Sequence, residues 1–330
     1  MKVKIGVIGA GHFGRYHIMK LLTLPEADLV GFFDIDQGRS EQIARELKVR
    51  AFSCSEELLA QCSAVSVVVP TAAHFPVVRD VIRHRRHVFC EKPFMLTTRQ
   101  ADAIVQLARS SKITLQVGHI ERFNPAFTSL RAEAVNPRFI EAHRVAPFGA
   151  RGTDVSVILE LMIHDIDLVL NLVKAPIRQV EAVGANILTQ NIDLANARLK
   201  FANGCIANLT ASRVATKSVR RLRIFQPEAC YNLDFLMKKT ELVRLVDDPE
   251  SSSIHPAQQN HYREEQWFRG LVRQELAAEP VDALREELRN FISSVQGRHV
   301  ATVSGEDGRQ ALAVANRIEK QILAKLKRVN

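Results

Sequence analysis

The sequence predicts an α/β domain with a parallel sheet at residues 1–120 and an α+β domain with a large, open, mainly antiparallel sheet at residues 121–330. In the first domain, short apolar runs rich in β-branched residues alternate with segments of helical periodicity, which is typical of a parallel sheet covered on both faces. In the second, segments that alternate apolar and polar residues follow one another closely, as in an antiparallel sheet. Asn203-Gly204 lies between two of these segments and is a strong signal for a two-residue hairpin turn.

The first domain is expected to contain five strands, each apolar along most of its length and therefore buried on both faces. A segment with helical spacing of apolar residues follows each of the first four strands. The strands are expected at 3–8, 29–33, 65–69, 87–90 and 113–117, and the helices near 12–24, 38–47, 73–84 and 97–109.

The second domain is expected to begin near Arg122-Phe-Asn-Pro125, where the rhythm of the first domain ends and a helix follows. Pro227-Glu228 is a second expected turn. The expected strands are 138–145, 180–187, 194–201, 205–212, 219–226, 229–235 and 241–246, the expected helices lie near 155–173, 262–276, 281–296 and 306–327, and 258–261 is expected to be a loop.

Composition bounds the class of protein. The chain has 330 residues, of which 46% are hydrophobic and 25% charged, which is ordinary for a globular protein. The formal charge of +9 is spread along the chain. Its densest cluster, Arg220-Arg221-Leu222-Arg223, fits a solvated surface better than a nucleic-acid site. We therefore expect no nucleic-acid partner.

Cysteine usage and hydropathy indicate the compartment. The five cysteines are odd in number and form no Cys-x-x-Cys pair, so neither a disulfide framework nor a zinc site is indicated. The start, Met1-Lys-Val-Lys-Ile-Gly, turns glycine-rich before a signal-peptide core can form. No apolar run approaches the ~20 residues of a membrane span. A soluble, cytoplasmic protein without membrane insertion is expected.

Gly9-Ala-Gly11-His12-Phe13-Gly14 directly follows the first strand and opens a helix. Its glycines permit a tight turn and a close backbone approach to a pyrophosphate, which the helix N-terminus then attracts. Asp34 ends the second strand about 20 residues further on, where an acid binds ribose hydroxyls. The motif therefore predicts dinucleotide binding. The Asp34 carboxylate favours NAD, although the nearby Arg39 keeps NADP possible; FAD is less favoured.

The segment Val88-Phe-Cys-Glu-Lys-Pro-Phe94 ends the fourth strand in charged residues. Ligands of such sheets gather at the carboxyl ends of the strands, and Pro93 favours an extended backbone at Lys92. Lys92 is therefore a candidate for the nicotinamide cleft. The alternative is a surface lysine beside a turn proline.

Together with Pro70-Thr71-Ala-Ala-His74, these two motifs resemble the family named after glucose–fructose oxidoreductase, inositol dehydrogenase and rhizopine catabolism proteins (Gfo/Idh/MocA). The resemblance covers essentially the whole chain and implies an N-terminal Rossmann domain. It also implies that Lys92 touches both the substrate hydroxyl and the nicotinamide ribose. The cofactor-binding residues expected on these grounds are Gly9, Gly11, His12, Phe13, Gly14, Asp34, Pro70, Thr71, His74, Glu91 and Lys92.

A polar stripe marks the long apolar helix expected at 155–173. Helical spacing places Glu160, His164, Asp167 and Asn171 along one line. The stripe could be the solvent-exposed edge of the helix, a metal site or the lining of a cleft. A metal is disfavoured because no second histidine joins it. By resemblance to the family, His164 is the catalytic acid/base, and Glu160 replaces an aspartate that lies near the substrate.

Longer matches bear on the substrate. The segments 139–148 and 196–213 resemble the subgroup of this family that oxidises the C3 hydroxyl of UDP-N-acetylglucosamine for the 3-amino sugar of lipid A, after which a separate aminotransferase acts. Such a substrate carries a pyrophosphate. The candidate substrate-binding residues are Arg122, Asn124, Arg144, Arg151, Glu160, His164 and Arg213, and each of the arginines Arg144, Arg151 and Arg213 could instead be sheet-surface charge.

The implied reaction is oxidation of a secondary alcohol by NAD, with His164 or a desolvated Lys92 as the base. Two alternatives remain: a dehydrogenase of a free sugar or inositol, which would need no arginines, and a non-catalytic dinucleotide-binding regulator, which the joint presence of Lys92 and His164 disfavours. The open face of the second sheet is expected to be apolar and covered by a partner subunit, in a homodimer or homotetramer.

Overall fold

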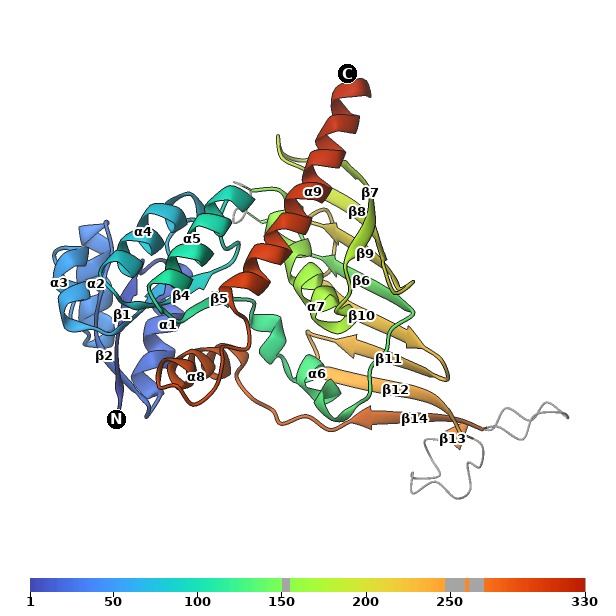
Figure 1. Ribbon diagram of the computed structural model, residues 1–330, viewed down its shortest axis with the longest axis horizontal. Helices are drawn as coiled ribbons and strands as arrows, with labels where there is room; N and C mark the ends of the chain where they lie inside the picture. The colour runs from blue at the N-terminus through green and yellow to red at the C-terminus, as the bar shows by residue number, and fades with distance from the viewer. Residues whose placement is uncertain (150–154, 247–258, 261–269, 330) are drawn as a thin grey trace, which may run out of the picture. The chain divides into compact units, whose positions relative to one another are not determined.

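A computed structural model describes residues 1–149, 155–246, 259–260 and 270–329 (Figure 1). The chain forms two compact units: the first is Met1–Phe123 with Val281–Ala313, and the second is Asn124–Pro280 with Val314–Asn330. The division predicted at residue 120 differs from these units, because the first unit also takes in a segment near the C-terminus. The two units are described separately below.

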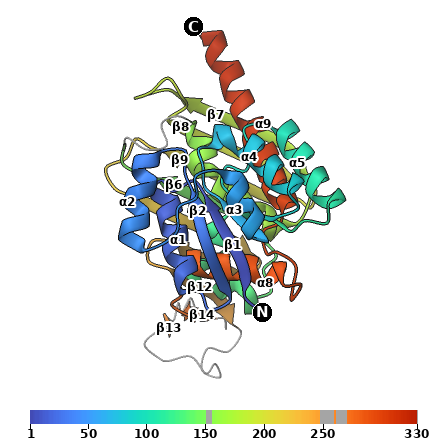
Figure 2. The same ribbon diagram turned by 90° about the vertical axis from the view of Figure 1, so that its left-hand side faces the viewer.

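The first unit is built on a parallel sheet of strand order β2-β1-β3-β4-β5. Figure 2 shows β1 and β2 of this sheet side by side. The predicted fold class is confirmed here, with most predicted bounds displaced by three residues or fewer. The short helix α3 was not predicted. The elements are β1 (Val3–Ile8), α1 (His12–Thr23), β2 (Ala27–Phe33), α2 (Gln37–Leu47), α3 (Ser55–Gln61), β3 (Ala64–Val67), α4 (Thr71–Arg83), β4 (His87–Glu91), α5 (Thr98–Ser110) and β5 (Leu115–Gly118).

The helix α8 (Ala283–Val295) completes the core of the first unit. Its buried Leu288, Phe291 and Ile292 belong to the same apolar cluster as residues of β1, β4 and α1. The rings of Phe291 and Phe89 lie 5.9 Å apart, edge to face. This packing explains why a helix so late in the sequence belongs to the first unit.

In the second unit, the described residues form a nine-stranded sheet of order β13-β14-β12-β11-β10-β6-β9-β8-β7. Neighbouring strands are antiparallel except for the parallel pair β6 and β9. The strands are β6 (Phe139–Val145), β7 (Ile177–Ala185), β8 (Leu194–Phe201), β9 (Ile206–Ser212), β10 (Val219–Gln226), β11 (Ala229–Asp234), β12 (Lys239–Val246), β13 (Gln259–Asn260) and β14 (Gly270–Leu276). This confirms the predicted large, mainly antiparallel sheet.

Two predictions near the end of this sheet are wrong. Residues 270–276, predicted as part of a helix at 262–276, form β14, which pairs with β12 along its whole length. Gln259–Asn260, predicted as loop, forms β13. The strand buries Val272 and Leu276 on one side, and a spacing of four residues fits a strand as well as a helix. Gln258 and residues 261–269 lie outside the described residues.

The open face of this sheet is polar, so the expectation that it is apolar is wrong. Salt bridges join neighbouring strands across it, and the paired side chains are 33% to 56% exposed. The pairs are Arg223–Glu141 at 3.3 Å, Lys239–Glu275 at 3.0 Å, Arg273–Glu241 at 3.0 Å and Lys200–Glu181 at 2.9 Å. The opposite face buries apolar residues against α7 (Figure 1).

The remaining elements are helical. They are η1 (Ile120–Phe123), α6 (Pro125–Thr128), η2 (Ser129–Ala132), η3 (Ile158–Met162), α7 (Ile163–Val173) and α9 (Gly305–Val329). None of the helices within the described ranges combines the length and apolar character that a membrane crossing requires.

Candidate functional site

The glycine loop leaves space at the start of α1. A methyl group at Gly14 would lie 2.0 Å from the carbonyl oxygen of Gly9, and Gly9 has a φ of 93°. A methyl group at Gly11 would meet no atom within 4 Å, and the first turn of α1 receives no hydrogen bond from a capping side chain at this position. Two glycines are therefore needed for the turn itself, while Gly11 keeps a surface open beside the first turn of α1. A cofactor pyrophosphate fits this arrangement.

The carboxylate of Asp34 is tied into the same loop. Its Oδ2 accepts the backbone N–H of Ala10 at 2.6 Å, and its Oδ1 accepts that of Asp36 at 2.9 Å. The Arg39 guanidinium lies on the carboxylate, with Nη1 3.1 Å from Oδ1 and 3.2 Å from Oδ2. Arg39 is 44% exposed, whereas Asp34 is almost fully buried. The acid and the nearby arginine identified in the sequence thus form one group.

His74 joins the ends of two strands. Its Nδ1 lies 3.0 Å from the Pro93 carbonyl oxygen and 3.2 Å from that of Phe94, and its Nε2 lies 2.9 Å from that of Val69. Burial lowers the pKa of His74, although the three carbonyl groups act in the opposite direction. The structure therefore places His74 as a buried brace between Val69 and the segment after Lys92. Pro70 and Thr71, which begin α4, remain at least partly exposed.

Glu91 links Lys92 to α1. Its Oε2 accepts the backbone N–H of Lys92 at 3.1 Å, and its Oε1 lies 3.0 Å from Nε2 of His17. Nδ1 of His17 in turn lies 2.9 Å from the Ser66 hydroxyl. The bond between Lys92 and Pro93 is cis. Lys92 is partly exposed at this strand end, Glu91 is 19% exposed, and His17 and Ser66 behind it are buried.

The helix that carries Glu160 and His164 is not uniform. The predicted helix is a π-helical turn, η3, followed by α7, and Glu160 lies in the π turn. Such turns occur frequently at functional sites. His164 is 9% exposed and Asp167 1% exposed. The interpretation of the stripe as a solvent-exposed edge is therefore wrong for these two residues.

Arg144 and Asp165 form a buried pair. Arg144 Nε lies 3.1 Å from both carboxylate oxygens and Nη2 lies 2.8 Å from Oδ1, with both side chains 2% exposed. The guanidinium also lies over the Phe235 ring, 5.6 Å from its centroid. Asp165 stands next to His164 in the chain, so this pair fixes α7 to β6 beside the candidate base. The Arg144 guanidinium thus contacts Asp165 and Phe235 inside the protein.

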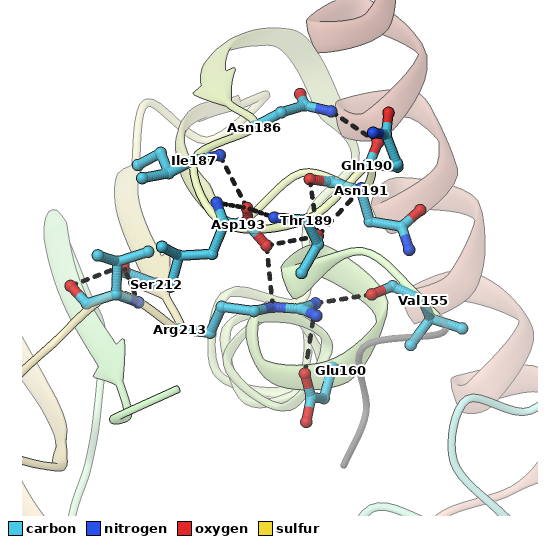
Figure 3. Close-up of polar contacts among 12 residues, drawn as sticks. Val155, Glu160, Asn186, Ile187, Thr189, Gln190, Asn191, Asp193, Ser212 and Arg213 are labelled. Atoms are coloured by element: carbon cyan, nitrogen blue, oxygen red, sulfur yellow. Dashed lines mark hydrogen bonds and ion pairs between the residues drawn. The ribbon is translucent and has the colours of Figure 1, made fainter. Parts of the chain in front are cut away.

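Arg213 lies just after β9 and contacts three other segments (Figure 3). Its Nη2 donates to the Val155 carbonyl oxygen at 2.6 Å and lies 3.4 Å from Glu160 Oε2, and its Nε lies 3.6 Å from Asp193 Oδ1. The structure thus brings together Arg213 and Glu160, two of the predicted substrate-binding residues.

The other predicted substrate-binding residues are placed separately. Arg122 belongs to the first unit and lies 3.9 Å from Asp307. Asn124 begins the second unit, caps α6 by accepting the Ala126 N–H, and donates to the Phe235 carbonyl. Arg151 lies outside the described residues. No group of three or more potential metal ligands occurs in the part of the chain that the structure describes.

Sequence reasoning missed His17 and Asp193, both fully buried polar residues. A signal existed for His17, because it shares the buried stripe of α1 with Gly14, Ile18 and Leu21. Asp193 precedes β8 in a polar loop, and the sequence gives no sign of its burial. Both lie in direct contact with predicted site residues.

Comparison with known proteins identifies the family of this chain. Residues 3–119 match the model of the Gfo/Idh/MocA oxidoreductase family with an NAD-binding Rossmann fold, and residues 127–230 match the C-terminal domain of the same family. UDP-N-acetylglucosamine 3-dehydrogenase of Acidithiobacillus ferrooxidans is 36% identical over 327 residues, which cover 99% of each chain. A solved structure of that enzyme gives a TM-score of 0.87 at 35% identity, covering 98% of this chain and 99% of the other.

A more distant relative, myo-inositol 2-dehydrogenase of Thermotoga maritima, is 25% identical and covers 97% of this chain and 96% of its own length. The glycine loop, the acid at the end of β2 and the lysine at the end of β4 thus stand in a chain that both of these relatives match over at least 97% of its length. This protein belongs to the Gfo/Idh/MocA oxidoreductase family, and its first unit is the NAD-binding Rossmann fold.

Proposed function

We propose that this protein oxidises a secondary alcohol of a sugar nucleotide to a ketone, with the C3 hydroxyl of UDP-N-acetylglucosamine as the substrate group. The observation that carries this proposal is the 36% identity with UDP-N-acetylglucosamine 3-dehydrogenase, which extends over 99% of both chains. Membership of an NAD-binding oxidoreductase family supplies the reaction class.

The first unit would hold NAD through the glycine loop Gly9–Gly14, with His12 and Phe13 on its outer side, through Asp34, and through Pro70 and Thr71 at the start of α4. When bound, NAD supplies the acceptor for the hydride that leaves the alcohol carbon. Asp34 offers oxygen acceptors to ribose hydroxyls. Glu91 and His74 would contribute indirectly, because their side chains hydrogen-bond to the backbone of Lys92 and Pro93.

In the second unit, His164 takes the proton from the substrate hydroxyl, because an imidazole titrates near neutrality and can act as a base there. Lys92 stabilises the negative charge that develops on the same oxygen. Glu160, 25% exposed, accepts a hydrogen bond from the sugar. Asp167 is 1% exposed and has a structural role in the helix.

The arginines change the argument about the substrate. Arg144 and Arg213 were candidates for the substrate pyrophosphate, but both guanidinium groups are engaged by buried carboxylates. We assign them to the support of His164 and Glu160 instead. The sugar-nucleotide proposal then rests on the full-length similarity, and the runner-up is a free sugar or inositol, supported by the inositol dehydrogenase among the relatives.

A turnover assay distinguishes these substrates. The purified protein is incubated with NAD and, in turn, UDP-N-acetylglucosamine, UDP-glucose and myo-inositol, and reduced cofactor is followed by absorbance. A 3-amino-sugar aminotransferase is added to trap the ketone, so that an unfavourable equilibrium does not hide the reaction. Turnover with UDP-N-acetylglucosamine alone supports the proposal. Turnover with myo-inositol alone replaces it with the runner-up, and NAD binding without any turnover favours a regulator.

Two variants test the catalytic residues. Lys92→Ala and His164→Ala should each lower kcat by about 10²–10⁴-fold, the usual contribution of a positioned acid or base, and leave the Kd for NAD nearly unchanged. The pH dependence of kcat/KM should lose its limb near neutrality in His164→Ala and keep it in Lys92→Arg. The opposite pattern would make Lys92 the base.

The cellular setting follows from the same proposal. A 3-keto sugar nucleotide is the substrate of an aminotransferase, so we place the enzyme in the route to the 3-amino sugar of lipid A. The five cysteines are all free thiols, which supports a cytoplasmic location. The polar open face of the second sheet would pair with a second copy through its charged ladders, in a dimer or tetramer.

A further inference from the structure

Asp193 is a buried carboxylate in the loop between β7 and β8. Its Oδ2 accepts the backbone N–H groups of Ile187 at 2.8 Å, Leu188 at 2.6 Å and Thr189 at 2.8 Å, and its Oδ1 accepts the Thr189 hydroxyl at 2.7 Å (Figure 3). Burial alone would raise the pKa of Asp193, but these hydrogen bonds hold it at about 2. The residue is therefore a fixed negative charge at every pH at which an enzyme would be assayed.

Arg213 connects this charge to Glu160. Its Nε lies 3.6 Å from Asp193 Oδ1, its Nη2 lies 3.4 Å from Glu160 Oε2, and Nη2 also donates to the Val155 carbonyl. A guanidinium group is a planar fork whose donors keep fixed directions. Holding one edge at Asp193 and another at Val155 therefore determines where the cation faces Glu160.

Exposure differs along this chain of charges. The side chain of Asp193 is 0% exposed and that of Arg213 5%, whereas Glu160 is 25% exposed. Only the last of these three can meet a ligand readily. The chain thus runs from a buried anchor to a carboxylate that reaches the accessible side of the π turn.

We propose that Asp193 is a positioning residue that, through Arg213, fixes the Glu160 carboxylate and so sets the affinity for the alcohol substrate. The inference rests on the proposed function, in which Glu160 accepts a hydrogen bond from the sugar. It also gives a reason for the glutamate in place of the family's aspartate: the longer side chain is held in place by Arg213.

A double-mutant cycle tests this link. Asp193→Asn keeps an oxygen for the loop N–H groups but removes the charge that faces Arg213. We expect it to raise KM for the alcohol substrate about tenfold, with kcat changed less than about threefold and the Kd for NAD unchanged. In a Glu160→Gln background the same substitution should raise KM less than about twofold, because the group through which it acts is already altered.

Thr189→Val provides the matched control. It removes the hydroxyl that ties the loop to Asp193 Oδ1 and leaves the contact between Asp193 and Arg213. If Asp193 acted only as a loop anchor, Thr189→Val would raise KM as Asp193→Asn does. We expect KM to stay within about twofold of the wild-type value. Arg213→Lys, which cannot reach three acceptors at once, should reproduce the rise in KM if Asp193→Asn fails to fold.

The same cycle is measured by urea unfolding, which needs no substrate. Asp193→Asn and Glu160→Gln should be coupled by about fivefold or more in the folded-to-unfolded ratio, because Arg213 contacts both carboxylates. Thr189→Val and Glu160→Gln should be additive. Additive effects of Asp193→Asn and Glu160→Gln in both measurements would overturn the proposal. Absence of wild-type turnover with every substrate would instead refute the proposed function. The unfolding measurements would still test whether Asp193 and Glu160 are coupled.

Discussion

Nε2 of His17 lies 3.0 Å from one carboxylate oxygen of Glu91, and the other oxygen accepts the backbone N–H of Lys92. His17 stands on α1, the helix that begins at the glycine loop, and Glu91 ends β4. Hydrogen-bonding side chains therefore connect the helix that follows the glycine loop to the backbone of the candidate catalytic lysine. Gly118 makes room for the carboxylate, because a methyl group there would lie 2.9 Å from Glu91 Oε2.

His17→Ala should lower kcat about tenfold and destabilise the protein by about 1–3 kcal/mol, because it removes the buried histidine that contacts the Glu91 carboxylate, which is only 19% exposed. Burial raises the pKa of Glu91, but the hydrogen bond and charge of His17, with Lys92, lower it below its usual 4.5. A lowered carboxyl pKa stabilises the fold above pH 4.5, and this contribution is lost as the pH falls through the folded-state pKa.

Urea unfolding should therefore show a large difference between wild type and His17→Ala at pH 7 and a smaller one below pH 4.5. His84→Ala, which removes an exposed histidine of the same unit, is the control and should change neither quantity. If the free energies of unfolding of wild type and His17→Ala differed equally at both pH values, the loss of stability would not depend on the charge of Glu91.

Gly11→Ala and Gly14→Ala should separate binding from folding. An alanine methyl at position 11 meets no protein atom, so the variant should keep its stability within about 0.5 kcal/mol and lose NAD affinity at least about tenfold. At position 14 the methyl group would lie 2.0 Å from a backbone oxygen, so folding itself should suffer. Thermal unfolding measures the stability of the two variants, and titration with NAD followed by fluorescence measures their affinity for the cofactor. Undiminished NAD binding by Gly11→Ala would show that the cofactor does not approach this surface.

Asp34 and Arg39 should set cofactor preference in opposite directions. Asp34→Asn reduces the repulsion of a 2′-phosphate while Arg39 remains, so the ratio of kcat/KM for NAD to that for NADP should fall about tenfold. Arg39→Ala removes the cation and should raise the same ratio. The ratio is measured with both cofactors at one ionic strength, and an unchanged ratio in both variants would exclude this pair from ribose recognition.

Arg144→Met should destabilise the second unit by about 3–5 kcal/mol, because it leaves Asp165 buried without its cation. Replacing both residues, as Arg144→Met with Asp165→Leu, should recover part of the loss. Lys239→Ala is the matched control: it breaks the pair with Glu275, whose side chains are both 56% exposed, and should cost less than about 1 kcal/mol. Stability is measured by urea unfolding. If Arg144→Met lost as little stability as Lys239→Ala, the Arg144–Asp165 pair would contribute little to the stability of the second unit.

The sequence predicted strands best where short-range rules apply. The bounds of β1, β8 and β10 agree with the prediction residue for residue. For β8, alternation and the Asn203-Gly204 turn that follows it are local signals. β14 was mistaken for a helix because its two buried residues are four apart. The packing of α8 on the first unit depends on tertiary contacts with Phe89 and its neighbours, which no local pattern contains.

The candidate site shows the same limit. Motifs singled out Lys92, Asp34 and His164 as candidates, since their chemistry and spacing are local. The partners of the arginines were not predictable, because Arg144 meets Asp165 and Arg213 meets Asp193 only after the second sheet has formed. A charged side chain in a sequence does not reveal whether it will face a ligand or another buried charge.

The path of the chain between the two units has a consequence for how the protein is made. Translation delivers part of the first unit, then most of the second, and only afterwards α8, whose Leu288, Phe291 and Ile292 close the apolar cluster around β1. Part of the apolar surface of the nascent dinucleotide-binding unit therefore stays uncovered until α8 has been synthesised, after most of the second unit. A gene fragment ending at residue 123 would encode the nucleotide motif but lack the three α8 residues that complete its apolar cluster.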